Sequence, residues 1–253
     1  MQRASGENYS KVKNLTAHFG LHTICSSGNC PNIGECWNAG TATFMILGDI
    51  CTRACRFCAT KTGKPLPPDP EEPAKMAAAI KILNLLHCVI TSVDRDDLPD
   101  GGAAHWAGVI NEIKKINPGI TIEALIPDFD GKKENINMII DAAPTIISHN
   151  LETVRRLTPV IRTKAKYDRS LSVIKMIADS GIPAKSGIML GLGEKEEEII
   201  ETMDDLRNAG CRILTIGQYL KPAEGYMEPV EYIHPDKFEE YRLKAIEKGF
   251  DFV

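Results

Sequence analysis

Short apolar runs alternate along this chain with longer segments in which apolar residues recur every three or four positions. Six of the short runs predict buried strands. They cover residues 43–47, 87–91, 120–125, 145–148, 184–190 and 213–218. Regular alternation of strand and helix patterns is typical of parallel strands joined by crossover helices. We therefore expect an α/β fold, a partial parallel (β/α)6 barrel of the TIM type.

Two of the intervening helices have recognisable faces and ends. The apolar positions that define these faces are Ile199, Ile200, Met203 and Leu206 in one helix, and Leu171, Ile174 and Ile177 in the other. Gly210 and Gly181 suit the left-handed position that commonly follows a last helical turn. Asp168 or Ser170 is the expected N-cap of the second helix because a short polar side chain can accept from the first free N–H groups.

Residues 61–73 interrupt the alternation with the sequence KTGKPLPPDPEEP, which contains five prolines. Proline lacks a backbone donor and disrupts both helix interiors and central strands. We therefore predict an extended surface loop between a cysteine-rich region and the first barrel helix. A linker between two domains is the alternative.

Composition excludes several classes of protein. The 253 residues are 43% hydrophobic, which is enough for a sizeable core. Thirty basic and 34 acidic residues give a net charge of −4, which argues against nucleic-acid binding. The sequence shows no apolar run approaching the roughly 18 residues of a membrane span, and its first residues are polar. We expect a cytoplasmic protein that binds neither membranes nor nucleic acid.

Six of the eight cysteines lie between Cys25 and Cys58. Cys51, Cys55 and Cys58 form a C-x3-C-x2-C run directly after the first predicted strand. Three thiolates on one loop can hold three irons of a [4Fe–4S] cluster and leave the fourth iron open to a small molecule. Loops after barrel strands are where such folds keep their chemistry. A zinc site or coincidental core cysteines are the alternatives.

A second set, Cys25, Cys30 and Cys36, has the spacing C-x4-C-x5-C. Glycine and proline keep this segment irregular, so its thiols can converge on a second centre. Structural zinc or a redox switch is the alternative. Cys88 and Cys211 lie in apolar strand contexts and are expected in the core.

The C-x3-C-x2-C run, with the aromatic Phe57 before its last cysteine, resembles the signature of the radical S-adenosylmethionine (SAM) superfamily. More specifically, the chain resembles the lipoyl synthase family over nearly its whole length. The segments that carry this likeness are residues 22–25, 30–32, 34–37, 40–45, 91–98, 100–103, 149–154, 186–194 and 217–220.

The resemblance implies an enzyme that inserts two sulfur atoms, at C6 and C8, into an octanoyl chain linked to a lysine of a carrier protein. It implies two [4Fe–4S] clusters. Cys51, Cys55 and Cys58 would hold the cluster that binds SAM and generates a 5′-deoxyadenosyl radical. Cys25, Cys30 and Cys36 would hold an auxiliary cluster that is consumed as the sulfur source. The family's usual serine ligand lies in a C-terminal motif that has no match before Val253, so we assign no fourth ligand.

The resemblance also suggests residues around SAM. Gly101 and Gly102 would approach its methionyl amino group, Asn150 and Glu152 its ribose, and Arg162 its carboxylate. Gly191 would border the adenosine and Gln218 would line the pocket. The structural alternatives are a plain turn for Gly101 and Gly102, a helix cap or surface pair for Asn150 and Glu152, and a solvated face for Arg162.

Six basic residues lie between Arg155 and Arg169, with Asp168 as the only acid. They predict either a solvated face or a docking patch for an acidic carrier, of the lipoyl-domain or glycine cleavage H protein type. An electron donor such as ferredoxin or flavodoxin is also implied.

We therefore expect residues 1–42 to form an N-terminal extension that carries the auxiliary cluster, and residues 43–253 to form the barrel. The functional alternatives are another two-cluster radical SAM enzyme that inserts sulfur, such as a methylthiotransferase or biotin synthase-like enzyme, and a non-catalytic iron–sulfur or zinc protein.

Overall fold

The computed structural model describes residues 6–39 and 41–253. Its main sheet has the strand order β1-β2-β5-β6-β7-β8-β9, and every neighbouring pair from β2 onward is parallel. The strands are β1 (His22–Thr23), β2 (Thr43–Ile46), β5 (His87–Ser92), β6 (Thr121–Leu125), β7 (Ile146–Ser148), β8 (Ala184–Leu190) and β9 (Ile213–Gln218). Six parallel strands in chain order confirm the predicted partial barrel, which is open between its first and last strands.

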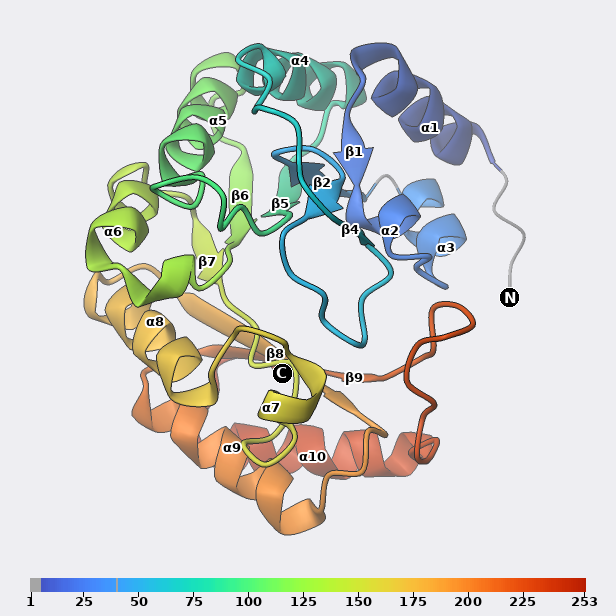
Figure 1. Cartoon of the computed structure of the whole chain (residues 1–253), viewed down its shortest axis with the longest axis vertical. Coiled ribbons are helices and arrows are strands. Elements are labelled where there is room, and N and C mark those ends of the chain that lie inside the picture. The colour runs from blue at the N-terminus through green and yellow to red at the C-terminus, as the bar shows by residue number, and fades with distance from the viewer. Residues whose placement is uncertain (1–5, 40) are drawn as a thin grey trace.

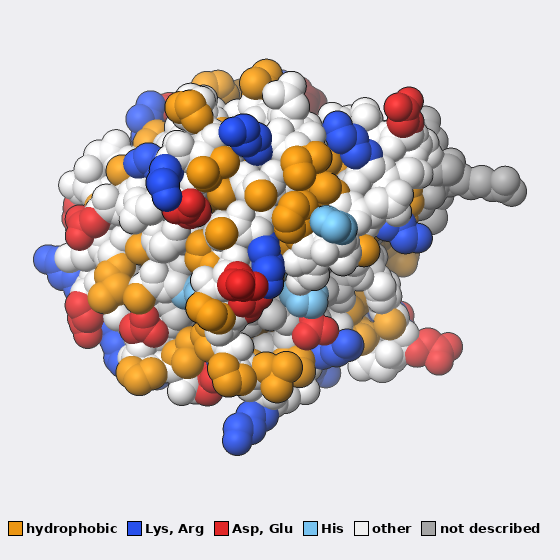
Figure 2. Space-filling view, turned by 90° about the horizontal axis from the view of Figure 1, so that it is seen from above, with side chains coloured by type: hydrophobic (Ala, Val, Ile, Leu, Met, Phe, Trp, Pro, Cys, Tyr) orange, Lys and Arg blue, Asp and Glu red, His pale blue; other side chains and the backbone are white. Residues whose placement is uncertain are grey.

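Helices follow the strands and lie outside the curved sheet, except for the short α7, which contacts the cysteine loop at the end of the barrel (Figure 1). They are α4 (Glu72–Leu83), α5 (Ala103–Ile116), α6 (Lys133–Asp141), α7 (Thr158–Ile161), α8 (Tyr167–Asp179), α9 (Glu196–Asn208) and α10 (Pro235–Glu247). One continuous apolar core lies between these helices and the strands; Trp106 of α5 and Phe44 of β2 are fully buried in it, as are Cys88 and Cys211. In the described ranges, none of the helices has the length and apolar character that crossing a membrane requires. On the face shown in Figure 2, basic and acidic side chains are interspersed with apolar ones, as the small net charge suggests.

Most predicted boundaries agree with the structure within a residue or two. Gly210 and Gly181 follow α9 and α8 with φ of 84° and 85°, which confirms their role in ending these helices. The expected N-cap of α8 is wrong. The N-cap is Lys166, so Asp168 and Ser170 lie inside the first turn. Ser170 is fully buried there because its hydroxyl contacts His149.

The proline-rich segment is a loop only in its middle part. Lys61–Thr62 forms β4, which pairs in parallel with β3 (Ile50–Cys51). At the other end, α4 already includes Glu72 and Pro73, because proline is tolerated in a first helical turn, where its missing N–H has no helical partner. The prediction of an extended loop is therefore wrong at both ends of residues 61–73.

The N-terminal segment is built onto the first barrel strand. It contains α1 (Glu7–Phe19), β1, α2 (Ile24–Ser27) and α3 (Ile33–Asn38). Strand β1 runs antiparallel to β2, with His22 opposite Met45 and Thr23 opposite Phe44. Helix α1 packs against α3 and α4. The division of the chain at residue 42 stays a prediction.

Candidate active site

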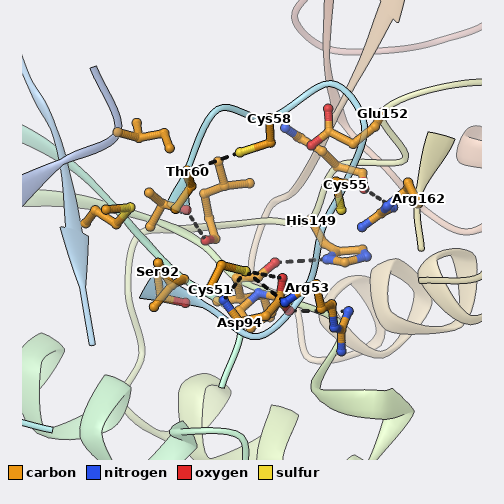
Figure 3. Close-up of a pocket in the computed structure, with 18 of the residues that line it drawn as sticks. Cys51, Arg53, Cys55, Cys58, Thr60, Ser92, Asp94, His149, Glu152 and Arg162 are labelled. Atoms are coloured by element: carbon orange, nitrogen blue, oxygen red, sulfur yellow. Dashed lines mark hydrogen bonds and ion pairs between the residues drawn. The ribbon is translucent and has the colours of Figure 1, made fainter. Parts of the chain in front are cut away.

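A cavity of about 290 Å³ lies at the carboxyl ends of the parallel strands (Figure 3). Its walls come from the segments after β2, β5, β6 and β7, which the barrel brings together. The predicted residues that line it are Cys51, Cys55, Phe57, Cys58, Asn150, Glu152 and Arg162. The cavity also has apolar walls formed by residues such as Ile24, Met45 and Leu125.

The Cys51 thiol is held by the backbone. Its Sγ accepts N–H groups from Arg53, at 3.4 Å, and from Asp94, at 3.3 Å. Burial, reinforced by the Asp94 carboxylate, raises the pKa of Cys51 to about 12. Burial likewise raises the pKa of Cys55 to about 11. Such thiols ionise only beside a strong positive charge, such as that of bound iron.

Cys58 completes this set of thiols, and its Sγ lies 3.2 Å from the Thr60 hydroxyl. Across residues 6–39 and 41–253, no three His, Cys, Asp or Glu side chains converge as ligands of one metal ion. A polynuclear cluster distributes its cysteines over separate irons, so its thiolates need not converge on one point. Three cysteines in a C-x3-C-x2-C run on one loop are therefore a donor set that fits an iron–sulfur cluster.

Arg162 lines this cavity, and one of its buried donors is unused. Its Nη1 donates to the carbonyl oxygens of Asn150, at 3.0 Å, and Leu151, at 3.3 Å. Its buried Nε has no hydrogen-bond partner within the described part of the chain. A buried N–H without a partner is costly, and an anionic ligand would satisfy it. Arg162 therefore fits the carboxylate of a ligand such as SAM.

Glu152 is held in a strained backbone conformation beside Arg162 (Figure 3). Its φ is 69°, in the left-handed region that non-glycine residues rarely adopt. Its backbone bridges to β8 through bonds with Gly187 and Met189. Burial raises the pKa of Glu152 although Arg162 and Asn150 oppose this effect. Strain at a cavity wall is typical of functional positions.

His149 and Ser170 form a chain of hydrogen bonds that ends at Arg162. His149 Nδ1 lies 2.9 Å from the carbonyl oxygen of Ile126, which only accepts, so this nitrogen carries the proton. Burial lowers the pKa of His149 to about 4, which keeps the ring neutral. Its Nε2 therefore accepts from the Ser170 hydroxyl, and Ser170 Oγ accepts from Arg162 Nη1 at 3.4 Å.

Four predicted residues are absent from the cavity lining that residues 6–39 and 41–253 form: Gly101, Gly102, Gly191 and Gln218. Gly102 has φ of 87°, and a Cβ there would lie 2.6 Å from Leu47 Cδ1. Gly191 has φ of 97°, and a Cβ there would lie 2.4 Å from Gln218 Nε2. Both glycines allow close packing of loops, and contact of these residues with SAM stays a prediction.

Comparison with known proteins agrees with this geometry. The model of the Radical SAM superfamily matches residues 45–206. The lipoyl synthase of Parabacteroides distasonis is 58% identical over 247 residues, which cover 98% of this chain and 88% of that protein. The lipoyl synthase of Phocaeicola vulgatus is 61% identical over 242 residues, or 96% of this chain and 85% of that protein. The chain belongs to the lipoyl synthase family of the radical SAM superfamily.

Solved structures similar to this lipoyl synthase family member share its fold at low identity. Methylornithine synthase (PylB) aligns with a TM-score of 0.64 and 13% identity, covering 93% of this chain and 73% of that one. HydG, a maturase of the [FeFe]-hydrogenase, aligns with a TM-score of 0.64 and 14% identity, covering 97% and 62%.

The second cysteine set of this family member begins directly after Ile24, a residue of the cavity wall. Thr23 caps α2 by accepting from the Ser26 N–H at 3.2 Å, which fixes the start of this segment. Burial and the charges of Cys30 and Cys25 raise the pKa of Cys36, so the three sulfurs are close enough to interact. Ile24, next to Cys25, lines the cavity.

Most of the basic run is paired within the chain. Arg155 pairs with Asp168 and Asp205, Arg156 with Glu198, Lys164 with Asp96, and Arg169 with Asp128 and Asp130. These partners neutralise four of the six basic side chains. The run is therefore a weaker candidate for docking an acidic carrier than its sequence suggests.

Sequence reasoning missed several residues that support the site: Arg53, Asp94, Asp128, His149 and Ser170. Arg53 had a sequence signal in its position between two cysteines of the C-x3-C-x2-C run, and Asp94 and His149 lie in segments that carry the family resemblance. The roles of these residues, and of Asp128 and Ser170, become recognisable only when the barrel places separate strand ends together.

Proposed function

We propose that this chain acts as a lipoyl synthase, inserting sulfur at C6 and C8 of an octanoyl chain on a carrier-protein lysine. Its support is the 58% identity to a curated lipoyl synthase along 98% of the chain. The structural observation that carries the proposal is one cavity lined by Cys51, Cys55 and Cys58 together with Arg162.

In this proposal, Cys51, Cys55 and Cys58 would hold the SAM-binding cluster. When bound, the cluster and SAM supply a carbon radical that takes hydrogen from unactivated carbon. Arg162 binds and orients the SAM carboxylate. Glu152 and Asn150 accept hydrogen bonds from its ribose hydroxyls. The apolar walls around Ile24 and Met45 exclude water from the reacting carbon.

Cys25, Cys30 and Cys36 hold the auxiliary cluster, from which the sulfur atoms come. Ile24, directly before Cys25, lies in the cavity wall, which supports a place for the octanoyl chain near this second set. The carrier would be a lipoyl domain or a glycine cleavage H-type protein. A ferredoxin or flavodoxin type of protein would supply electrons.

The test is an anaerobic assay of reconstituted protein with SAM, a strong reductant and an octanoyl-lysine peptide, read by mass spectrometry. The unsubstituted chain should give lipoyl peptide and 5′-deoxyadenosine. Joint replacement of Cys25, Cys30 and Cys36 by Ala should preserve 5′-deoxyadenosine formation and abolish sulfur insertion. Joint replacement of Cys51, Cys55 and Cys58 should abolish both.

Cys88→Ala provides the matched control, because Cys88 is a buried core cysteine of β5 that belongs to neither set and does not line the cavity. It should retain both products. Absence of both products from a chain with two intact clusters would refute the proposed activity. Bound zinc without labile sulfide would favour the non-catalytic alternative.

A further inference from the structure

Arg53 lies between two cysteines of the cluster loop, and its side chain is only 3% exposed. The guanidinium contacts three carboxylates at once. Its Nε and Nη2 form a fork with the two oxygens of Asp96, each at 2.8 Å. Its Nη2 also donates to Asp128 Oδ1 at 2.8 Å, and its Nη1 lies 3.3 Å from Asp94 Oδ1.

These carboxylates belong to two different strand ends. Asp94 and Asp96 follow β5, and Asp128 follows β6. Backbone bonds add to the connection with β5: the Thr52 N–H donates to the Asp94 carbonyl at 3.1 Å, and the Asp96 N–H donates to the Thr52 hydroxyl at 3.0 Å. Arg53 therefore connects the cysteine loop to two parts of the barrel, the segment after β5 and the segment after β6.

The attachment has a direct consequence for a ligand thiol. The two N–H groups directed at Cys51 Sγ are those of Arg53 and Asp94, and the ion pair joins the side chains of these same residues. Hydrogen bonds to cluster sulfurs are a main determinant of the reduction potential. The position of the Arg53 side chain is thus coupled to the donors around one cluster ligand.

We propose that Arg53 is a positioning residue for the SAM-binding cluster, which keeps two backbone donors on Cys51 Sγ and so sets cluster retention and potential. This inference rests on the proposed cluster site. The competing explanation is that Arg53 only stabilises the fold, as any buried arginine with acidic partners would.

Arg95 offers a matched control in the segment that follows β5. Its side chain is 1% exposed and forms a fork with Asp97, at 2.9 and 2.8 Å. Its remaining hydrogen bond goes to the Leu47 carbonyl at 3.2 Å. These partners lie outside the cysteine run, so Arg95 shares the burial and pairing of Arg53 but not its attachment to Cys51.

The experiment compares Arg53→Lys, Asp128→Asn and Arg95→Lys in a full-length chain whose Cys25, Cys30 and Cys36 are replaced by Ala. Lysine keeps the charge but cannot form the fork and the third contact together. Asp128→Asn weakens the hold on Arg53 from the β6 side without altering the cysteine loop, and it replaces Arg53→Lys if that variant does not fold. Circular dichroism verifies folding of each variant.

Iron content, the rate of cluster loss to a chelator and the midpoint potential from redox titration by electron paramagnetic resonance are then measured. We expect Arg53→Lys and Asp128→Asn to lose the cluster about 10- to 100-fold faster, with a lower potential. Arg95→Lys should lower thermal stability and leave both cluster properties unchanged.

Unchanged retention and potential in the folded Arg53→Lys and Asp128→Asn variants would overturn the inference and leave a structural arginine. Equal cluster effects of Arg95→Lys would also overturn it, because any buried ion pair of the segment after β5 would then suffice. If the chain with intact Cys51, Cys55 and Cys58 retains no iron at all, the proposed cluster site itself fails, which is a distinct result.

Discussion

Ser170 Oγ lies 2.9 Å from Nε2 of His149 and is also within hydrogen-bond distance of Arg162. Both His149 and Ser170 are fully buried, so their bond is protected from water. The serine hydroxyl has one proton, which it gives to the neutral histidine, and its oxygen remains free to accept from the guanidinium. The pair therefore fixes the direction of Arg162 toward the cavity.

Ser170→Ala should weaken SAM binding. The substitution removes one of the acceptors that orient Arg162, which corresponds to about 1 kcal/mol, or about fivefold in affinity. Equilibrium dialysis with labelled SAM on cluster-loaded protein measures this change. Ser172→Ala is the control because Ser172 is exposed on the same helix and bonds only to the Asp168 carbonyl. Equal SAM affinity in both variants would contradict a positioning role for Ser170.

His149 should make stability depend on pH. Its folded-state pKa of about 4 lies below the usual value near 6.5, so the unfolded chain binds the proton more readily between these values. The free energy of unfolding should therefore be highest above about pH 6.5 and fall by about 3 kcal/mol toward pH 4. Urea denaturation at several pH values tests this. His149→Gln should flatten the slope, whereas the same change at the exposed His87 should preserve it.

Glu152→Gln should raise the stability of the protein and lower its affinity for SAM. The carboxylate is disfavoured by burial, as its raised pKa shows, so the neutral amide should increase the melting temperature. In the proposed site, the same change weakens acceptance of the ribose hydroxyls and should lower SAM affinity by about tenfold. Thermal unfolding and dialysis measure the two effects. Glu201→Gln, at an exposed position of α9, should change neither, and a less stable Glu152→Gln protein would disprove this reasoning.

Glu72→Ala should destabilise the segment that leads into the cysteine loop. Glu72 Oε2 accepts from the buried Leu47 N–H at 2.9 Å and lies 2.6 Å from His105 Nε2. Leu47 has φ of 68°, so this carboxylate supports a strained turn directly after β2. Removing it leaves a buried donor unsatisfied, at about 1–3 kcal/mol in the free energy of unfolding.

Urea denaturation measures that cost, with Glu71→Ala as the control. The Glu71 side chain is 74% exposed and pairs only with Lys75, so its loss should change stability by less than about 1 kcal/mol. Similar losses in the two variants would show that the Leu47 N–H finds another acceptor.

The barrel was predictable because its strands are nearly continuous apolar runs and its helices have one apolar face. Ala184–Leu190 and Ile213–Gln218 agree residue for residue. The N-cap of α8 was not predictable, because Ser170 is held by His149 from another element rather than by its own helix. Local preferences compete with such tertiary contacts and lose when the contact is buried.

The candidate site likewise has one part that the sequence predicts and another that only the fold brings together. Spacing alone identified the cysteine sets, because their members are near neighbours along the chain. Arg53 and Asp128 are 75 residues apart, and their contact depends on the adjacent positions of β5 and β6. The ion pairs of Arg169 and Lys164 likewise form only in the folded chain. They show where the charges of the basic run are directed, which the sequence alone did not decide.

The antiparallel pairing of β1 with β2 also sets the distance between the two cysteine sets. Cys25 comes two residues after Thr23, which is paired with Phe44, and Cys51 follows β2 by a short connection. A strand can shift against its neighbour only in whole residues, about 3.3 Å at a time, and a shift by one residue turns every side chain to the opposite face. The distance between the two cysteine sets can therefore change only in steps of whole residues. Distances between these steps are incompatible with the pairing of β1 and β2.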